Sequence, residues 1–206
     1  MSFYERHVLP RLLDLVMRDP DMAVLRARFV PLAEGRVLEI GIGSGLNLPF
    51  YRPGAVSTLF GLDPSDRLRR LASRRLGQVP FPVALLGFSA EGIPLGDRSV
   101  DCVVSTWTLC SIPDAGKALA EARRVLKPGG RLIFIEHGRA PDIGVAAWQD
   151  RLNGVWGRIG GGCNLNRDIG ALVRGAGFAV DGLETGYLER HPRVLAFLSR
   201  GVGTPA

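Results

Sequence analysis

The sequence has few cysteines and no long apolar run, and both features limit what the protein can be. Its 206 residues include three cysteines, Cys102, Cys110 and Cys163, whose irregular spacing contains no CxxC pair. No apolar run approaches the roughly 20 residues of a membrane span. Charged residues at positions 5–7 interrupt any signal-peptide core. We therefore expect a cytoplasmic protein with reduced thiols, no metal site and no signal peptide.

Lysine is also scarce, which bears on the meaning of the net charge of +6. Lysine occurs at positions 117 and 127, and the many arginines are scattered, with the densest group at 67–75. That group fits the solvated face of a helix. The chain contains neither an N/D-P-P-Y/F motif nor an appended RNA-binding module, so we expect no nucleic-acid partner. A weak attraction to anionic lipid headgroups stays open.

The sequence alternates between two kinds of segment, which predicts a single α/β domain over residues 1–206. Helical periodicity marks residues 65–76 and 114–126, and the second segment ends in a Lys-Pro-Gly-Gly stop. Such alternation is typical of a parallel sheet with helices on both faces. The predicted buried strands are 36–42, 57–63, 81–88, 100–106 and 131–137.

Three glycines at alternate positions follow the first predicted strand. Gly41, Gly43 and Gly45 allow a sharp turn and a close approach of the backbone to a ligand. Asp63 ends the second predicted strand, where its carboxylate can accept both hydroxyl protons of a ribose. The pair predicts an adenosine-type ligand, and on these residues alone NAD and S-adenosylmethionine both remain open.

Further motifs separate these two ligands. An acid, Glu39, precedes the glycines, "SAEGIPLGDRSVDCVVS" occupies 89–105, and "VLKPGGRLIF" occupies 125–134. With these motifs the chain resembles the class I S-adenosylmethionine-dependent methyltransferases, in their ubiquinone/menaquinone-biosynthesis-like group. The resemblance implies a doubly wound, mostly parallel seven-stranded sheet of the Rossmann-like methyltransferase fold. It also implies one antiparallel strand, placed by a last hairpin for which 177–186 and 191–200 are suitable.

The resemblance also implies where S-adenosylmethionine binds. The glycines would pass along the methionine part of the cofactor, Asp63 would hold the ribose, and the Ala90 backbone would meet the adenine edge. Many relatives carry an aspartate where this chain has Ser89. The complete implied cofactor set is Glu39, Gly41, Gly43, Gly45, Asp63, Pro64, Ser89, Ala90, Glu91 and Thr106.

The second half of the chain bears on the methyl acceptor. The motif GCN-x-x-R at 162–167, with "TLCSIPD" at 108–114 and "FIEHG" at 134–138, resembles the thiol methyltransferases among the methyltransferase-like proteins. A thiol is therefore the favoured acceptor, and a phospholipid amine or a quinone precursor are the alternatives. A cofactor-binding regulator without activity is the rival class. Animal members carry an N-terminal membrane anchor, which we do not expect here.

Two residues are candidates for catalysis. His137 ends the fifth predicted strand and is predicted to act as a general base or to orient the acceptor. Arg167 is predicted to favour a thiolate, with a structural anchor that binds loop carbonyls as the alternative.

The first 30 residues are predicted to form a helical lid over the acceptor site. Apolar residues recur at helical spacing from Tyr4 to Val16, and arginines flank them. The same segment could instead lie on the inner surface of a membrane as a peripheral contact. The oligomeric state stays open. The predicted acceptor-side residues are Tyr4, His7, Trp107, Cys110, Trp148 and Cys163.

Overall fold

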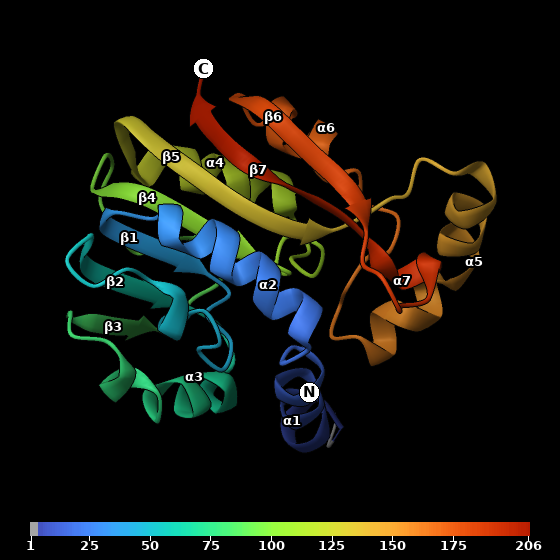
Figure 1. Cartoon of the computed structure of the whole chain (residues 1–206), viewed down its shortest axis with the longest axis horizontal. Coiled ribbons are helices and arrows are strands. Elements are labelled where there is room, and N and C mark those ends of the chain that lie inside the picture. The colour runs from blue at the N-terminus through green and yellow to red at the C-terminus, as the bar shows by residue number, and fades with distance from the viewer. Residues whose placement is uncertain (1–3) are drawn as a thin grey trace.

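The computed structural model describes residues 4–206, apart from the side chains of Glu5 and Arg6. Seven strands form one sheet in the order β3-β2-β1-β4-β5-β7-β6 (Figure 1). Strands β1 to β5 run parallel, and β7 pairs antiparallel with both of its neighbours. The predicted fold, including its antiparallel strand, is confirmed. The strands are β1 (Gly35–Ile40), β2 (Val56–Leu62), β3 (Val83–Leu86), β4 (Val100–Thr106), β5 (Leu126–His137), β6 (Phe178–Tyr187) and β7 (Phe197–Pro205).

Three strand predictions have wrong boundaries. β5 begins at Leu126 rather than at 131, so the Lys-Pro-Gly-Gly segment predicted as a helix stop lies within the strand. β3 is shorter than the predicted 81–88, because Pro80 and Pro82 flank its start and cannot donate to a strand ladder. The last strand begins at Phe197 rather than at 191. Pro192 instead precedes a short helix, α7 (Arg193–Ala196), which delays entry into the sheet.

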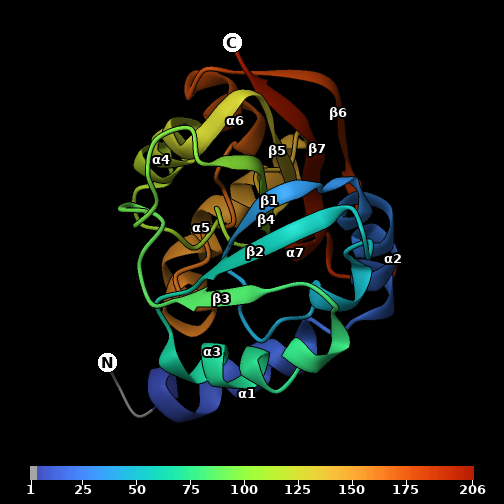
Figure 2. The same cartoon turned by 90° about the vertical axis from the view of Figure 1, so that its left-hand side faces the viewer.

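Helices cover both faces of the sheet (Figures 1 and 2). One face packs Leu38 and Ile40 of β1 against α4 and α6, and the other packs Val37 of the same strand against α2. The alternation along β1 follows from the two-residue period of a strand, with both faces buried as in parallel sheets. The helices are α2 (Pro20–Phe29), α3 (Asp66–Ser73), α4 (Ala115–Val125), α5 (Ile143–Ile159) and α6 (Ile169–Gly175).

The N-terminal segment forms a π-helical turn (Tyr4–Val8) followed by α1 (Leu9–Val16). The start of the predicted lid, residues 1–3, lies outside the described residues. α1 lies beside α3 in both views (Figures 1 and 2), and an ion pair of 3.0 Å joins Asp14 of α1 to Arg75, just beyond α3. Within residues 4–206, no helix has both the length and the apolarity needed to cross a bilayer.

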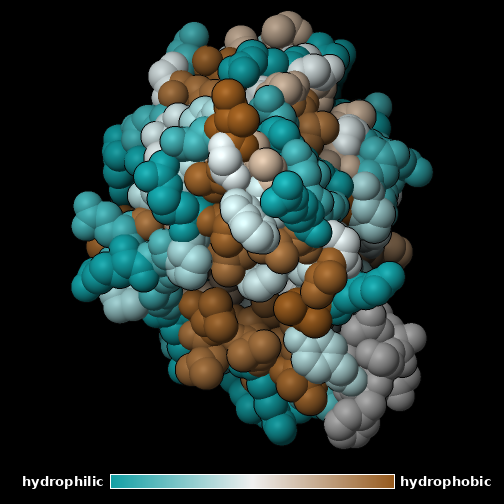
Figure 3. Space-filling view, turned by 90° about the vertical axis from the view of Figure 1, so that its right-hand side faces the viewer, coloured by the Kyte–Doolittle hydropathy of each residue, from teal (hydrophilic) through white to brown (hydrophobic). Residues whose placement is uncertain are grey.

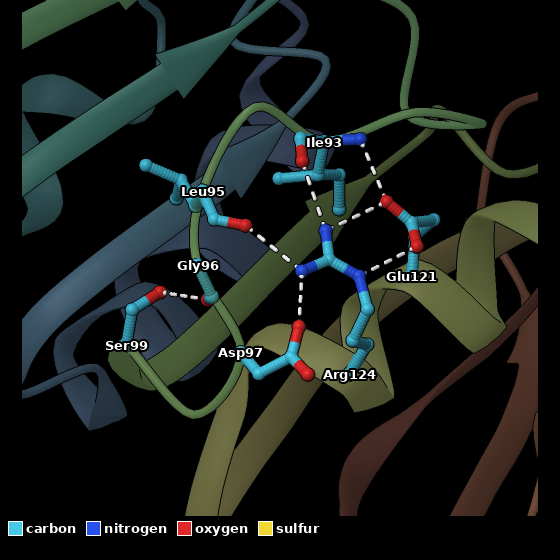
Figure 4. Close-up of polar contacts among 7 residues, drawn as sticks. All are labelled: Ile93, Leu95, Gly96, Asp97, Ser99, Glu121 and Arg124. Carbon is cyan, nitrogen blue, oxygen red and sulfur yellow. Dashed lines mark hydrogen bonds and ion pairs between the residues drawn. The ribbon is translucent and has the colours of Figure 1, made fainter.

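A single arginine fixes the loop that leads into β4 (Figure 4). Arg124 of α4 donates to the carbonyl oxygens of Ile93 and Leu95 and pairs with Asp97 and Glu121. Glu121 in turn accepts from the Ile93 N–H. These bonds join the loop to α4, so the chain after Ser89 is held in place at the cavity described below.

Candidate active site

A cavity of about 790 Å³ opens at the carboxyl ends of the parallel strands. The loops after β1, β2, β3 and β4 line it, together with α1. This is the place where ligands bind in open α/β sheets, because loops from neighbouring strands converge there. Its volume lies in the upper part of the range for ligand pockets, roughly 300–1,000 Å³.

Most of the predicted cofactor residues line this cavity. Those that do are Glu39, Gly41, Gly43, Asp63, Pro64, Ser89, Ala90 and Thr106. Gly45 and Glu91 do not belong to the lining. The strand ends therefore bring together residues that are up to 67 positions apart, as the resemblance implied.

Glu39 is buried at the base of the cavity within a hydrogen-bond network. Its carboxylate accepts from Asn47 Nδ2 at 2.9 Å and from the Tyr51 hydroxyl at 2.8 Å. Asn47 also donates to Thr106 Oγ1 and accepts from Arg26 Nε. Burial raises the pKa of Glu39 to about 8, although these hydrogen bonds and the charge of Arg26 act in the opposite direction.

Asn47, Tyr51 and Arg26 are functional candidates that sequence reasoning missed. Asn47 and Tyr51 donate to Glu39, and Arg26 interacts with Glu39 through its charge and donates to Asn47. None of the three belongs to a recognisable motif, and Arg26 lies on α2, outside the sheet. Burial lowers the pKa of Arg26 to about 10, which leaves the guanidinium charged at neutral pH. Asn47, two positions after Gly45, was the one local sequence feature that could have indicated this network.

Asp63 joins the glycine loop to the second strand. Its carboxylate accepts from the Gly43 N–H at 3.0 Å and from the Ser65 N–H at 2.8 Å. Burial is the main cause that raises the pKa of Asp63. Each oxygen retains a second lone pair, so the carboxylate can still accept from a ligand hydroxyl.

The glycines of the loop have different roles. Gly43 has φ +55°, and a Cβ there would meet no atom closer than 3.8 Å, so its open side lies against the cavity. Gly45 has φ +82°, and a Cβ would lie 2.9 Å from Leu48 Cδ1. Gly45 therefore serves the turn and its packing, and the predicted contact with the cofactor is not seen.

The Ser89–Glu91 turn presents Ser89 and the Ala90 backbone to the cavity, whereas Glu91 faces elsewhere. The Glu91 carboxylate accepts from Ser89 Oγ at 2.8 Å and from the Asp114 N–H at 2.8 Å. Glu91 thus holds the turn against the start of α4. Its predicted place in the cofactor site is corrected to a position behind that site.

The N-terminal segment and the loop after β4 provide the apolar walls of the cavity. Leu9, Leu13 and Met17 line one side, and Trp107 and Ile112 line another. His7 also lines the cavity, as predicted, and its Nδ1 lies 3.1 Å from the Arg67 guanidinium. The structure therefore places α1 at the cavity, and its function as a lid stays a prediction.

Several predicted acceptor-side residues lie outside the described lining. The Tyr4 hydroxyl donates to the Ile159 carbonyl, which ties the N-terminal turn to α5. Trp148 is 56% exposed on α5, where Arg151 stacks on its ring. Both side chains make contacts outside the lining, and α5 runs beyond the edge of the sheet (Figure 1).

His137 does not reach the cavity but lies in a buried cluster with two cysteines. Its Nδ1 lies 3.6 Å from Cys163 Sγ, and the donor atoms of Cys110, His137 and Cys163 all lie within 4.8 Å of one another. A hydrogen bond from Cys110 lowers the pKa of Cys163 to about 5, and the pKa of Cys110 rises. The predicted contact of His137 with an acceptor is not seen, since its ring is directed to these thiols.

Arg167 acts as a structural anchor. Its guanidinium donates to the carbonyl oxygens of Leu109, Ile112 and Pro113 in the loop after β4. The loop N–H groups bind Glu136, whose pKa burial raises to about 7. These contacts are those expected of a structural anchor. They are not the contacts expected of a residue that binds the acceptor.

Comparisons with known proteins agree with this geometry. A family model described as a methyltransferase domain matches residues 38–134. Human thiol S-methyltransferase TMT1B is 34% identical over 175 residues, which cover 82% of this chain and 69% of the relative. The rat TMT1B protein is 35% identical over 155 residues, which cover 73% of this chain and 63% of the relative. The chain thus spans about two thirds of the length of these relatives.

Solved structures show the same fold. A methyltransferase from Leishmania major superposes with a TM-score of 0.70 at 19% identity, covering 98% of this chain and 80% of that one. An S-adenosylmethionine-dependent methyltransferase from Aquifex aeolicus has a TM-score of 0.61 at 19% identity, covering 94% and 97%.

The fold, the site and these matches together define a class I methyltransferase that depends on S-adenosylmethionine. Within that class, the chain belongs to the family that includes the thiol S-methyltransferases TMT1A and TMT1B.

Proposed function

We propose that this methyltransferase acts on a small or lipophilic thiol. The observation that carries the proposal is the composition of the cavity, whose lining combines acidic residues with large apolar side chains. The names of the relatives, thiol S-methyltransferases at 31–35% identity, favour a thiol over other acceptors of the same size.

The acidic residues of the lining suit the cofactor. S-adenosylmethionine supplies an electrophilic methyl group on a sulfonium and carries a ribose diol and an ammonium group. Asp63 offers free lone pairs to hydroxyls, and the buried Glu39 carboxyl offers acceptor oxygens at the base of the cavity. The open side of Gly43 leaves room for a ligand against the backbone. These features fit the cofactor, with Thr106, Pro64, Ser89 and Ala90 completing its walls.

The apolar residues of the lining suit an acceptor whose carbon chain is uncharged. Leu9, Leu13 and Met17 face a wall that contains Trp107 and Ile112, so an alkyl or aryl group can be buried between them. The transfer then forms a sulfur–carbon bond as the methyl–sulfonium bond breaks, and needs mainly alignment and the exclusion of water.

Arginines line the cavity beside the carboxylates of Asp14, Asp63 and Asp66, and the arginines are the groups that favour a thiolate. They are Arg26, Arg67 and Arg70, and nearby positive charge lowers the pKa of a thiol. Nδ1 of His7 accepts from Arg67, because a guanidinium can only donate. We propose that the acceptor loses its proton to solvent and is bound as the thiolate.

Matched acceptors test this proposal. The protein is assayed with radiolabelled S-adenosylmethionine against an alkyl thiol and the amine and alcohol of the same chain length. We expect label on the thiol and little on the other two. Thiols of different pKa should shift the pH–activity profile with their own ionisation, and His137→Gln should leave that shift in place. Labelling of the amine alone would overturn the thiol assignment.

A phospholipid amine is the second candidate. A phosphatidylethanolamine N-methyltransferase from Cereibacter sphaeroides is 30% identical over 105 residues, which cover 50% of this chain. Exposed apolar side chains on α1 and α5 favour access to a lipid surface. Against it, Trp107 is the one tryptophan in the described lining, and Arg26 already stacks on its ring at 4.8 Å. Phosphatidylethanolamine vesicles in the same assay distinguish the two acceptors.

A further inference from the structure

We infer that Cys110, His137 and Cys163 form a binding site for a zinc ion, separate from the methyl-transfer cavity. The three residues lie on different elements: the loop after β4, the end of β5, and the loop between α5 and α6. None of them lines the cavity as described. Two thiols and an imidazole are the donor set that zinc prefers.

The distances agree with three donor atoms that share one ion, and both cysteines are free thiols. Zinc–sulfur and zinc–nitrogen bonds of about 2.3 and about 2.0 Å place the two donor atoms about 3.5 Å apart at a tetrahedral angle. His137 Nδ1 and Cys163 Sγ are 3.6 Å apart, and Cys110 Sγ lies within 4.8 Å of both donor atoms. A disulfide between Cys110 and Cys163 would leave the convergence of the imidazole without a function.

The charge of the set also suits a buried divalent cation. Two thiolates and one neutral imidazole balance a charge of +2, so the occupied site would carry no net charge into the interior. Cys110 and His137 are buried, whereas Cys163 is partly exposed and gives the ion a path from solvent. Three protein ligands leave a fourth position for a solvent molecule.

The surrounding structure holds all three ligands before any ion binds. Asn164 donates to the Cys110 carbonyl through both its N–H, at 2.8 Å, and its Nδ2, at 2.9 Å. This pair of bonds fixes the Cys110 loop to the residue that follows Cys163. Arg167 binds the carbonyls on either side of Cys110, at Leu109 and Ile112. His137 ends a strand that pairs with β7 as far as Leu198. A preformed site loses little entropy on binding.

Metal binding by the reduced full-length protein, expressed without a polyhistidine tag, tests the inference. Zn²⁺ is titrated against a chromophoric chelator, and Co²⁺ is added in parallel as a spectroscopic probe. We expect one ion per chain and a cobalt–thiolate charge-transfer band. Cys110→Ser, Cys163→Ser and His137→Asn should each weaken zinc binding by at least tenfold. Cys102→Ser is the matched control, since Cys102 is a buried free cysteine in β4 outside the cluster, and should bind zinc as the unchanged protein does.

Circular dichroism of each variant separates loss of ligands from loss of fold, and the titration of the unchanged protein does not depend on any variant. No zinc binding to that reduced protein would overturn the inference. A cobalt spectrum without a thiolate band, or equal loss of affinity in Cys102→Ser, would also overturn it. Failure of the thiol-acceptor assay would leave these results unaffected, because none of them uses the methyl acceptor.

Discussion

Asp63 links two functions at the scale of a single residue. Its carboxylate orders the glycine loop through the Gly43 N–H and the turn into α3 through the Ser65 N–H. We propose that the remaining lone pairs of this carboxylate accept hydrogen bonds from the ribose hydroxyls of the cofactor. Substitution of this residue therefore tests both the cofactor assignment and the order of the loop.

Asp63→Ala is expected to weaken S-adenosylmethionine binding by roughly 1.5 to 3 kcal/mol, the scale of hydrogen bonds to a charged group. This corresponds to roughly 10- to 150-fold in Kd. Isothermal titration of both proteins measures it, and Asp181→Ala, an exposed acid on β6, is the matched control. Equal affinity of the Asp63 variant and the unchanged protein would contradict the placement of the ribose at Asp63.

Glu39 gives a pH dependence of stability whose sign is fixed by its burial. The native pKa is about 8, against an ordinary value of 4.5 for a glutamate, so the native state retains a proton that the unfolded chain releases. This contribution is full below about pH 4.5 and is lost as the pH rises to about 8. Urea unfolding at pH 5, 6.5 and 8 should show that Glu39→Gln loses less stability over this range than the unchanged protein.

The control for Glu39 is Glu184→Gln. Glu184 is a surface carboxylate. Desolvation raises its pKa, but the hydrogen bonds and charges of Arg28 and Arg200 together outweigh this and lower the pKa. Its contribution is present above its unfolded pKa and changes little between pH 5 and 8. Parallel curves for Glu39→Gln and the unchanged protein would show that Glu39 is ionised in the fold.

At the scale of elements, α1 belongs to the cavity rather than to the core. The buried clusters on the two faces of the sheet begin with Leu25 of α2 and include no residue of α1. Leu9, Leu13 and Met17 instead line the cavity. This division supports the proposal that the N-terminal segment acts as a lid, because a lid must be separable from the fold that it covers.

Deletion of residues 1–18 is expected to leave the sheet folded and to abolish turnover, since the cavity loses one apolar wall. Far-ultraviolet circular dichroism and radiolabel transfer measure the two effects. Leu13→Ser and Leu15→Ser are a matched pair of point variants, because Leu13 lines the cavity and Leu15 is exposed. Only Leu13→Ser should lower turnover, and full activity of the deletion variant would rule out the lid.

The sequence predicted elements better than it predicted side-chain partners. The apolar runs and the glycine loop were sufficient for the parallel strands and for most of the cofactor residues, because both depend on local pattern and on one rule of sheet topology. Glu91 and Arg167 were assigned to ligands, but they bind backbone groups of neighbouring loops. The Cys110–His137–Cys163 cluster was not predicted, because successive members are 27 and 26 positions apart and converge only through tertiary folding.

At the scale of the whole molecule, the apolar surface is unevenly distributed. Figure 3 shows a broad apolar area on the lower half of the face that carries α5. Trp148, Leu152, Val155 and Ile159 are exposed at the spacing of one face of that helix. Arg151 and Arg158 are exposed on the same helix. A contiguous apolar surface of this kind with flanking cations fits the interfacial region of a membrane.

We propose that this face, together with the exposed Leu12, Leu15 and Val16 of α1, contacts anionic lipid surfaces peripherally. The protein should sediment with vesicles that contain phosphatidylglycerol, and less with pure phosphatidylcholine, because the net charge of +6 attracts anionic headgroups. Leu152→Asp combined with Val155→Asp should reduce sedimentation at least fivefold while turnover of a soluble thiol persists. Val24→Asp is the matched control, since Val24 is 67% exposed on α2, away from α5 (Figure 1).

If the double variant sediments as the unchanged protein does, the apolar face of α5 is not the contact. If added salt releases the unchanged protein completely from the vesicles, charge alone accounts for binding, because buried apolar contacts resist screening.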